Sequence, residues 1–227
     1  MCSSASYAVG MPVDFQASLL DGLAPSAGAP ALAGLGSSVR RTPLSHGAWV
    51  DVRPGWVTGA DDLFVRLVHD VPWYAERRQM YDRVVDVPRL LKFYGADDLL
   101  PDPLLIEARD RLSEHYADEL GEPFTTAGMC LYRDGRDSVA WHGDTIGRSR
   151  TEDTMVAIVS LGEARRLLLR PRGGSGRGGS TVSFALGHGD LLVMGGSCQR
   201  TWEHAVPKTS RPVGPRISVQ FRPRGVR

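Results

Sequence analysis

Two imidazoles and one carboxylate in this 227-residue chain have the types and spacing of a metal site. His142 and Asp144 are two residues apart, so on a β-strand their side chains point to the same face. His204 supplies a second imidazole later in the chain. Two histidines and one carboxylate on one face bind non-haem Fe(II) and leave coordination positions open. The sequence therefore predicts an iron(II) site at His142, Asp144 and His204.

The spacing alone is weak evidence, because the chain also contains a second His-x-Asp pair at His188 and Asp190. A single histidine is more often structural than a ligand. The first pair gains weight from the segment between Arg216 and Arg222, where polar and apolar residues alternate strictly. Alternation of this kind predicts a strand with one packed face and one polar face. Two guanidinium groups on that polar face indicate a bound carboxylate, which arginine can hold with two hydrogen bonds.

Taken in order, His142-x-Asp144, His204 and Arg216-x5-Arg222 resemble the signature of the AlkB family. These proteins are Fe(II)- and 2-oxoglutarate-dependent dioxygenases that dealkylate nucleic acid bases. The similarity covers roughly residues 60 to 225. Three further segments share it, at residues 131–135, 157–162 and 186–194.

The resemblance implies roles for individual residues. Fe(II) is bound by the three ligands, and 2-oxoglutarate is bound by Arg216 with help from Tyr132, while Ser218 and Arg222 line the same site. His188 and Asp190 are turn residues by the same resemblance. The chain departs from the family at two positions, because Cys130 and Ser218 stand where the family has asparagine. Cysteine is a poor hydrogen-bonding group and serine is shorter, so both changes weaken the expected contacts to 2-oxoglutarate.

The implied activity is oxidative demethylation of alkylated bases of the 1-methyladenine and 3-methylcytosine type, in DNA repair. In such a reaction 2-oxoglutarate is oxidised to succinate and CO₂, and the methyl group leaves as formaldehyde. Two alternatives stay open. One is a 2-oxoglutarate oxygenase that acts on a protein or small molecule, and the other is a nucleic-acid-binding homologue with impaired catalysis. DNA is the expected partner ahead of RNA.

The region from Trp73 to Gly95 resembles the family's lid, which recognises the nucleotide and contains a Pro-Arg…Tyr-Gly element. An enzyme that modifies a base takes it out of the stack, and the base can then stack on an aromatic ring. The candidate nucleic acid contacts in this region are Tyr94, Phe93, Trp73 and Arg89, with Tyr94 preferred. For each aromatic ring, ordinary core packing is the alternative.

A glycine-rich segment at residues 170–180 predicts a hairpin loop that carries Arg170, Arg172 and Arg177. These arginines could bind a phosphate backbone, with affinity that depends on salt. The alternative is a simple connector.

The predicted fold class is α+β, mainly β, with a jelly-roll core flanked by N-terminal helices. Amphipathic periodicity predicts helices at residues 61–69 and 104–116. The family fold is a double-stranded β-helix, which agrees. We expect a low-complexity, mobile tail at residues 1–37, an extension with helices and lid at 38–125, and the catalytic core at 126–227. The last two form one domain.

The cysteine content and the apolar segments of the chain indicate the cellular compartment in which the protein acts. The three cysteines lack Cys-x-x-Cys spacing, which argues against a disulfide framework or a zinc site. We found no secretory signal and no apolar run long enough for a membrane span, so a cytoplasmic monomer without membrane contact is expected.

Net charge is +1 overall, but residues 61–120 carry −6 and residues 165–227 carry +10. This asymmetry favours a basic nucleic-acid face, with an ordinary solvated surface as the alternative.

Overall fold

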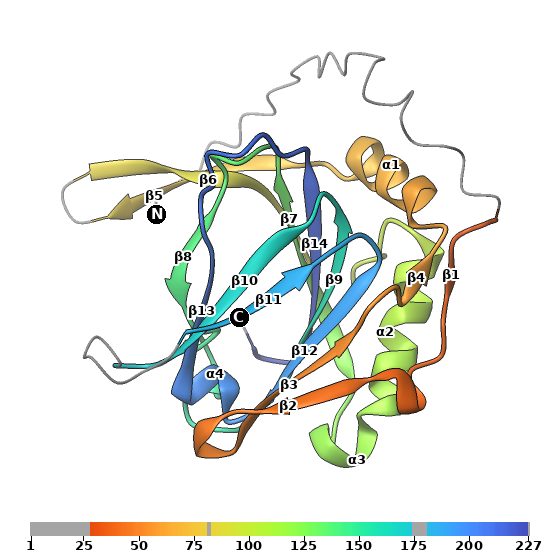
Figure 1. Ribbon diagram of the computed structural model, residues 1–227, viewed down its shortest axis with the longest axis vertical. Helices are drawn as coiled ribbons and strands as arrows, with labels where there is room; N and C mark the ends of the chain where they lie inside the picture. Colours follow the sequence, from red (N-terminus) through yellow and green to blue (C-terminus); the bar gives the residue numbers. More distant parts are fainter. Residues whose placement is uncertain (1–27, 81–82, 174–180, 227) are drawn as a thin grey trace.

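Antiparallel β-sheet dominates the computed structural model, which describes residues 28–80, 83–173 and 181–226 (Figure 1). The larger sheet has eight strands. In spatial order they are β2 (Arg40–Pro43), β3 (Ala48–Arg53), β12 (Asp190–Gly196), β9 (Val156–Gly162), β14 (Arg216–Pro223), β7 (Phe124–Tyr132), β6 (Arg83–Tyr94) and β5 (Tyr74–Met80).

A smaller four-stranded sheet faces the larger one. Its strands in spatial order are β11 (Val182–Leu186), β10 (Arg165–Pro171), β13 (Trp202–Val206) and β8 (Val139–His142). One apolar cluster joins residues of both sheets, such as Ile158 and Leu192 from the larger and Leu167 and Leu169 from the smaller. The two sheets therefore enclose a core, and the predicted jelly-roll, mainly β fold is confirmed.

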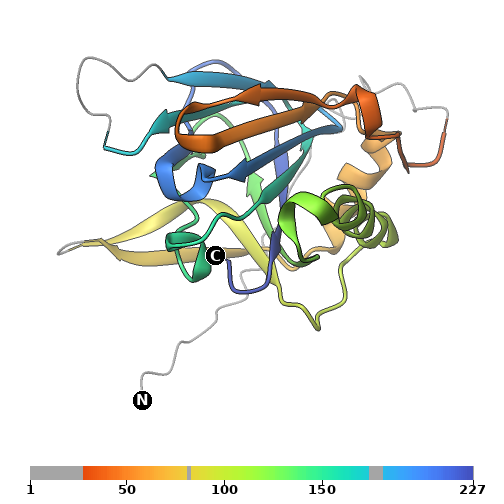
Figure 2. The same cartoon turned by 90° about the horizontal axis from the view of Figure 1, so that it is seen from below.

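Helices cover the opposite face of the larger sheet (Figures 1 and 2). They are α1 (Ala60–Asp70), α2 (Pro103–His115) and the short α3 (Ala117–Leu120), while the short α4 (Cys198–Thr201) links β12 to β13. The chain also forms 3-10 turns at Gly36–Ser38, Ser45–Gly47 and Arg148–Arg150. Both predicted helices are present. α2 begins where the Asp102 carboxylate accepts a hydrogen bond from the Leu104 amide at 2.9 Å, followed by proline at the first helical position.

Strand β14 lies inside the larger sheet, where it pairs with β9 on one side and with β7 on the other. Its apolar residues Ile217, Val219 and Phe221 are fully buried in the core beneath the helices. Its polar residues alternate with them and face the space between the two sheets. The predicted strand and its two faces are confirmed.

One expectation about the N-terminal part needs revision. A two-stranded sheet pairs β1 (Ala31–Leu32) with β4 (Val57–Thr58), and Leu32 is buried in the core. The predicted tail boundary at residue 37 is therefore too late, because backbone pairing and burial of one leucine fix the chain earlier; residues 1–27 lie outside the described residues. The predicted lid is an antiparallel hairpin of β5 and β6 that extends the edge of the larger sheet (Figure 2). Within the described residues, we found no helix long and apolar enough to cross a membrane.

Candidate metal and cosubstrate site

Neighbouring strands of the smaller sheet bring the three predicted metal ligands together. His142 on β8 lies opposite His204 on β13 in the sheet register, and their ring centroids are 4.2 Å apart. Asp144 follows β8 directly, and its Oδ1 lies 3.6 Å from His142 Nε2. One donor atom from each residue lies within 4.8 Å of the others. This donor set fits a divalent iron ion.

The protonation states also suit metal binding. His142 Nδ1 lies 2.9 Å from the Ala140 carbonyl oxygen and donates to it, which leaves Nε2 as the free donor atom. Burial, reinforced by His142, lowers the pKa of His204 to about 3, so this imidazole is neutral. Burial by itself raises the pKa of Asp144, but Arg222 and the two imidazoles outweigh it and lower that pKa below its ordinary value. The site thus offers the neutral imidazole of His204, Nε2 of His142 and one carboxylate anion.

Arg222 holds the carboxylate ligand. Its Nε and Nη2 lie 2.8 and 2.7 Å from Asp144 Oδ2. Arg222 was expected to line the cosubstrate site, and the structure places its guanidinium against the metal ligand Asp144. The ion pair leaves Oδ1 directed toward His142 and therefore available to a metal.

Gln199 on α4 supports the same ligand and was not found from the sequence. Its side chain is buried, and its Oε1 accepts a hydrogen bond from the Asp144 amide at 3.1 Å. Gly143 permits this approach, because a Cβ there would lie 2.8 Å from the Gln199 carbonyl oxygen. The Ser149 hydroxyl donates to the Asp144 carbonyl from the other side. Backbone contacts therefore fix the position of Asp144.

Replacing Gln199 with alanine should weaken metal binding about 10-fold, at the low end of the loss expected when a group that orients a ligand is removed. The buried Asp144 amide would lose its acceptor, and the carboxylate would lose its fixed orientation. Titration of the apoprotein with Fe(II) or Mn(II) measures this effect. Arg200→Ala is the matched control, because Arg200 lies on the same helix but pairs with Asp153. Equal affinities of the Gln199 variant and the native protein would contradict the role.

Arg216 places a buried positive charge at the other end of the same interior face. The residue is 2% exposed, and its Nε donates to the Ser160 hydroxyl at 2.9 Å. Its Nη1 is buried without a hydrogen-bond partner among the described residues. Burial lowers the pKa of Arg216 and raises that of the neighbouring Tyr132 to about 12. A buried guanidinium with an unused donor fits a carboxylate ligand.

The two departures from the family pattern lie on this face between the metal ligands and Arg216. Cys130 and Ser218 are opposite each other on β7 and β14. Gln220 fills the space near them, since its Nε2 donates to Ser218 Oγ at 2.9 Å and lies 3.5 Å from Cys130 Sγ. An amide is therefore present here, but it comes from Gln220.

A comparison with protein families agrees with this geometry. The model of the 2OG-Fe(II) oxygenase superfamily matches residues 95–222, which is more than half of the chain. The chain belongs to this superfamily of oxygenases. Its members are the dioxygenases that use Fe(II) and 2-oxoglutarate, so the enzyme class and the cofactors expected from the sequence are confirmed.

Relatives named as alkB homologs support the resemblance to the AlkB family that the sequence motifs indicated. The chain is 31% identical over 193 residues to alpha-ketoglutarate-dependent dioxygenase alkB homolog 3 of Bos taurus, covering 74% of this chain and 64% of that protein. It is 27% identical over 179 residues to the human DNA oxidative demethylase ALKBH2, covering 72% and 68%. This oxygenase thus spans less than two thirds of its alkB homolog 3 relative. A Pseudomonas putida prolyl-4-hydroxylase shares the fold, with a TM-score of 0.51, 17% identity and coverage of 80% and 95%.

The aromatic residues predicted to contact nucleic acid lie in different environments in this oxygenase. Tyr94 is 7% exposed and belongs to the core beneath the helices, which favours packing over stacking on a base. Trp73 also packs against that core, and its indole N–H donates to the Leu67 carbonyl at 3.2 Å. Phe93 is 37% exposed on the other face of β6. Tyr94, the ring preferred from the sequence, therefore lies in the core, and Phe93 is more exposed.

The arginines of this oxygenase that were predicted to contact nucleic acid also lie in different environments. Arg89 Nη1 donates to the Ser138 carbonyl at 3.1 Å, so it ties the lid to the loop before β8. Arg172 is exposed, and its Nη2 donates to the Gln199 carbonyl at 3.3 Å beside the metal ligands. Arg177 lies outside the described residues. Arg170 pairs with Glu203 and stacks over the Trp141 ring.

The second His-x-Asp pair lies in a turn, away from the ligand cluster. His188 Nδ1 accepts a hydrogen bond from the Gly162 amide at 2.7 Å, and Asp190 accepts from the amides of Gly55 and Gly187. Both side chains therefore stabilise turns and loops by accepting backbone hydrogen bonds.

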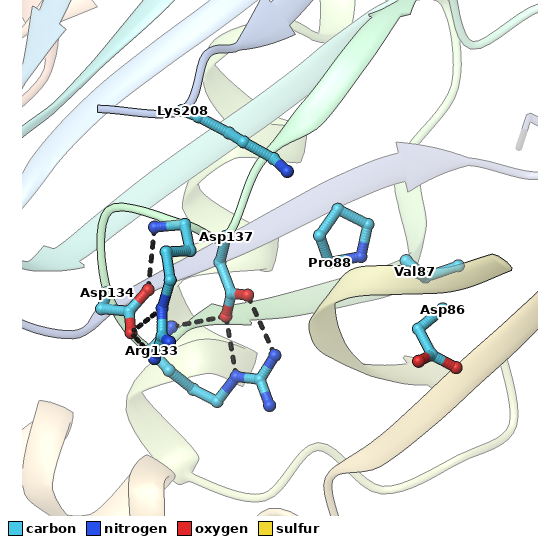
Figure 3. Close-up of a pocket in the computed structure, with 8 residues that line it drawn as sticks. Asp86, Val87, Pro88, Arg133, Asp134, Asp137 and Lys208 are labelled. Carbon is cyan, nitrogen blue, oxygen red and sulfur yellow. Dashed lines mark hydrogen bonds and ion pairs between the residues drawn. The ribbon is translucent and has the colours of Figure 1, made fainter. Parts of the chain in front are cut away.

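A cavity of about 440 Å³ separates the lid from the loop between β7 and β8 (Figure 3). Two ion pairs close its loop side, Arg133 with Asp137 and Arg136 with Asp134. Lys208 points into it from the segment after β13 (Figure 3). Because both arginines in its wall are neutralised by aspartates, this cavity has no concentrated positive charge.

Proposed function

We propose that this oxygenase demethylates alkylated bases in nucleic acid, with DNA as the preferred substrate. The observation that carries the proposal is one interior face with the iron ligand set at one end and Arg216 at the other, whose Nη1 has no hydrogen-bond partner among the described residues. The names of the relatives supply the substrate class, since one of them is a DNA oxidative demethylase.

Each residue of the site has a distinct task. His142, Asp144 and His204 would hold Fe(II), and Arg222 keeps Asp144 ionised and oriented. Arg216 binds the far carboxylate of 2-oxoglutarate with its free Nη1, and Ser160 fixes the direction of the guanidinium. The buried Tyr132 packs beside Arg216, with the guanidinium carbon 5.3 Å from the ring centroid. The protein thus supplies binding and orientation.

The iron, when bound, supplies activation of O₂. One oxygen atom enters 2-oxoglutarate, which loses CO₂ and becomes succinate, and the other enters a C–H bond of the N-methyl group. The resulting N-hydroxymethyl group then breaks its C–N bond, the electron pair of that bond returns to the base nitrogen, and the hydroxyl proton is released to solvent. Formaldehyde and the unmodified base leave.

Product release tests this proposal. The purified protein, with Fe(II) and 2-oxoglutarate, is given oligonucleotides with 1-methyladenine or 3-methylcytosine and matched unmethylated controls. Release of succinate and formaldehyde only with methylated substrate is the expected result. Succinate without formaldehyde would indicate an oxygenase of other substrates, and neither product from iron-loaded protein would favour a binding homologue. DNA and RNA versions of one sequence decide the preference.

Arg172 should add a phosphate contact beside the metal ligands. Changing it to alanine is expected to weaken oligonucleotide binding and to lower the slope of log affinity against log salt by about one. The measurement is fluorescence anisotropy over a range of salt concentrations. Arg111→Ala is the matched control, because Arg111 lies on α2, which covers the opposite face of the sheet. An unchanged salt slope in the Arg172 variant would rule out the contact.

A further inference from the structure

Gln220 lies between Ser218 and Arg222 on the polar face of β14 (Figure 1). Its side-chain amide contacts both neighbours, because Nε2 donates to Ser218 Oγ at 2.9 Å and Oε1 accepts from Arg222 Nη2 at 3.2 Å. Nε2 also lies 3.5 Å from Cys130 Sγ. One side chain therefore joins the guanidinium that holds Asp144 to the residues between the metal ligands and the cosubstrate arginine.

The direction of these hydrogen bonds is fixed by the arginine. A guanidinium group only donates, so the amide oxygen of Gln220 must face Arg222 and the amide nitrogen must face Ser218. The Ser218 hydroxyl is thus used as an acceptor, and its own hydrogen is left over. Ser218 is 3% exposed, and among the described residues its Oγ makes no other hydrogen bond. A buried hydroxyl hydrogen without an acceptor is costly unless a ligand supplies one.

A second hydroxyl in the same cross-strand row has the same arrangement. Ser160 on β9 is opposite Ser218, and its Oγ accepts from Arg216 Nε at 2.9 Å. Directly opposed residues of antiparallel strands point to the same face. Both hydroxyls therefore accept from a side chain of β14 and keep a hydrogen for a ligand that lies across the row. Such a ligand must be rich in acceptor oxygens, as 2-oxoglutarate is.

Gly128 on β7 makes room for the amide. It is opposite Gln220, and a Cβ there would lie 3.3 Å from Gln220 Oε1 and 2.8 Å from Arg222 Nη1. The two side chains therefore rest over a strand position that has no side chain of its own. This lets Arg222 reach Gln220 and Asp144 at the same time.

We propose that Gln220 is a positioning residue that makes the Ser218 hydroxyl a hydrogen-bond donor to 2-oxoglutarate and links this contact to the metal ligand Asp144 through Arg222. The hydrogen bonds run in one direction, from Arg222 to Gln220, to Ser218 and to a cosubstrate whose oxygens accept. Hydrogen bonds in such a chain strengthen one another. The inference rests on the binding of 2-oxoglutarate between the metal ligands and Arg216. It goes beyond the proposed function, because it holds for any substrate that is oxidised.

Gln220→Met tests the role, because methionine keeps the length of the side chain and lacks the amide. Protein loaded with Mn(II) should bind 2-oxoglutarate about 3- to 10-fold more weakly after this change, the loss expected for one hydrogen bond between neutral groups. Isothermal titration measures the affinity without any turnover. The affinity for Mn(II) in the absence of 2-oxoglutarate should fall less, because Arg222 keeps both of its contacts to Asp144.

A double-mutant cycle with Ser218→Ala separates positioning from a merely structural role. Ser218→Ala alone should also weaken 2-oxoglutarate binding about 3- to 10-fold. If Gln220 acts through the Ser218 hydroxyl, Gln220→Met should then cost nothing further in the Ser218→Ala background. Losses that add in full, or an unchanged affinity for 2-oxoglutarate in either single variant, would overturn the proposal.

Ser113→Ala is the matched control for a general loosening of the sheet. Ser113 lies on α2, on the opposite face of the sheet, and its Oγ accepts from the Phe124 amide at 3.0 Å where β7 begins. This variant should lower thermal stability and leave the cosubstrate affinity unchanged, and an equal loss of that affinity would overturn the proposal.

Two further outcomes are kept apart. If Gln220→Met does not fold, Gln220→Asn carries the test, because its shorter amide cannot reach both Arg222 and Ser218. Failure of the native protein to bind 2-oxoglutarate would overturn the cosubstrate site, and the role of Gln220 with it. A native protein that binds 2-oxoglutarate but releases no formaldehyde from methylated oligonucleotides would overturn the proposed function and leave the cycle as the test of Gln220.

Discussion

Changing His142 to alanine should abolish succinate release and remove the bound iron together. His142 Nε2 is the free donor of a ligand set with only two other members, and neither neighbouring strand offers a replacement among the described residues. The expected result is turnover indistinguishable from protein without iron. Iron content after anaerobic loading and succinate release are the two measurements.

The sequence supplies a matched control for this change, because the chain contains a second His-x-Asp pair. His188→Ala removes the same side chain from a turn, where the imidazole only accepts a hydrogen bond from the Gly162 amide and pairs with Asp61. It should cost about 1 kcal/mol of stability and leave iron binding in place. Full activity in the His142 variant, or iron loss in both variants, would refute the assignment of the ligands.

Changing Arg216 to alanine should raise the dissociation constant of 2-oxoglutarate by about 30-fold or more, while Fe(II) binding is retained. Removing one member of a buried charge pair costs about 2–5 kcal/mol, because the other member is left desolvated. Isothermal titration with 2-oxoglutarate measures this loss directly. The stabilisation against heat that 2-oxoglutarate gives the native protein should also be smaller in the variant at the same ligand concentration.

Arg216→Lys separates charge from geometry in the same experiment. Lysine keeps a positive charge but lacks the planar group with which Arg216 bonds Ser160 and offers Nη1 at the same time. Its affinity for 2-oxoglutarate should fall between those of the native protein and the alanine variant. A cosubstrate constant that is unchanged in Arg216→Ala would show that the carboxylate binds elsewhere.

Local periodicity explains what could be predicted from the sequence. The two amphipathic helices and the alternating strand β14 follow from side-chain patterns within a dozen residues, and α1, α2 and β14 occur where these patterns are found. The ligand pair His142 and Asp144 could also be predicted, because residues two apart point to the same side of any extended segment.

Long-range contacts explain what could not be predicted. Gln199 reaches the Asp144 amide only because a four-residue helix turns it toward the His-Gly-Asp segment, 55 positions away in sequence. Tyr94 and Phe93 are adjacent, so they point to opposite faces of β6, and sequence alone did not reveal which face met the helices. A shift of one residue exchanges the two faces of a strand, which is why the ring preferred from the sequence lies in the core.

Strand β8 lies at the edge of the smaller sheet and has β13 as its sole neighbour there, with an irregularity in the register just beyond His204. Two of the three ligands stand opposite each other on these strands. A metal ion bound by both would act as a cross-link between an edge strand and its neighbour, next to the irregularity in their register. The metal site would then also stabilise the fold at this edge. Metal binding and the ordering of β8 would be thermodynamically coupled.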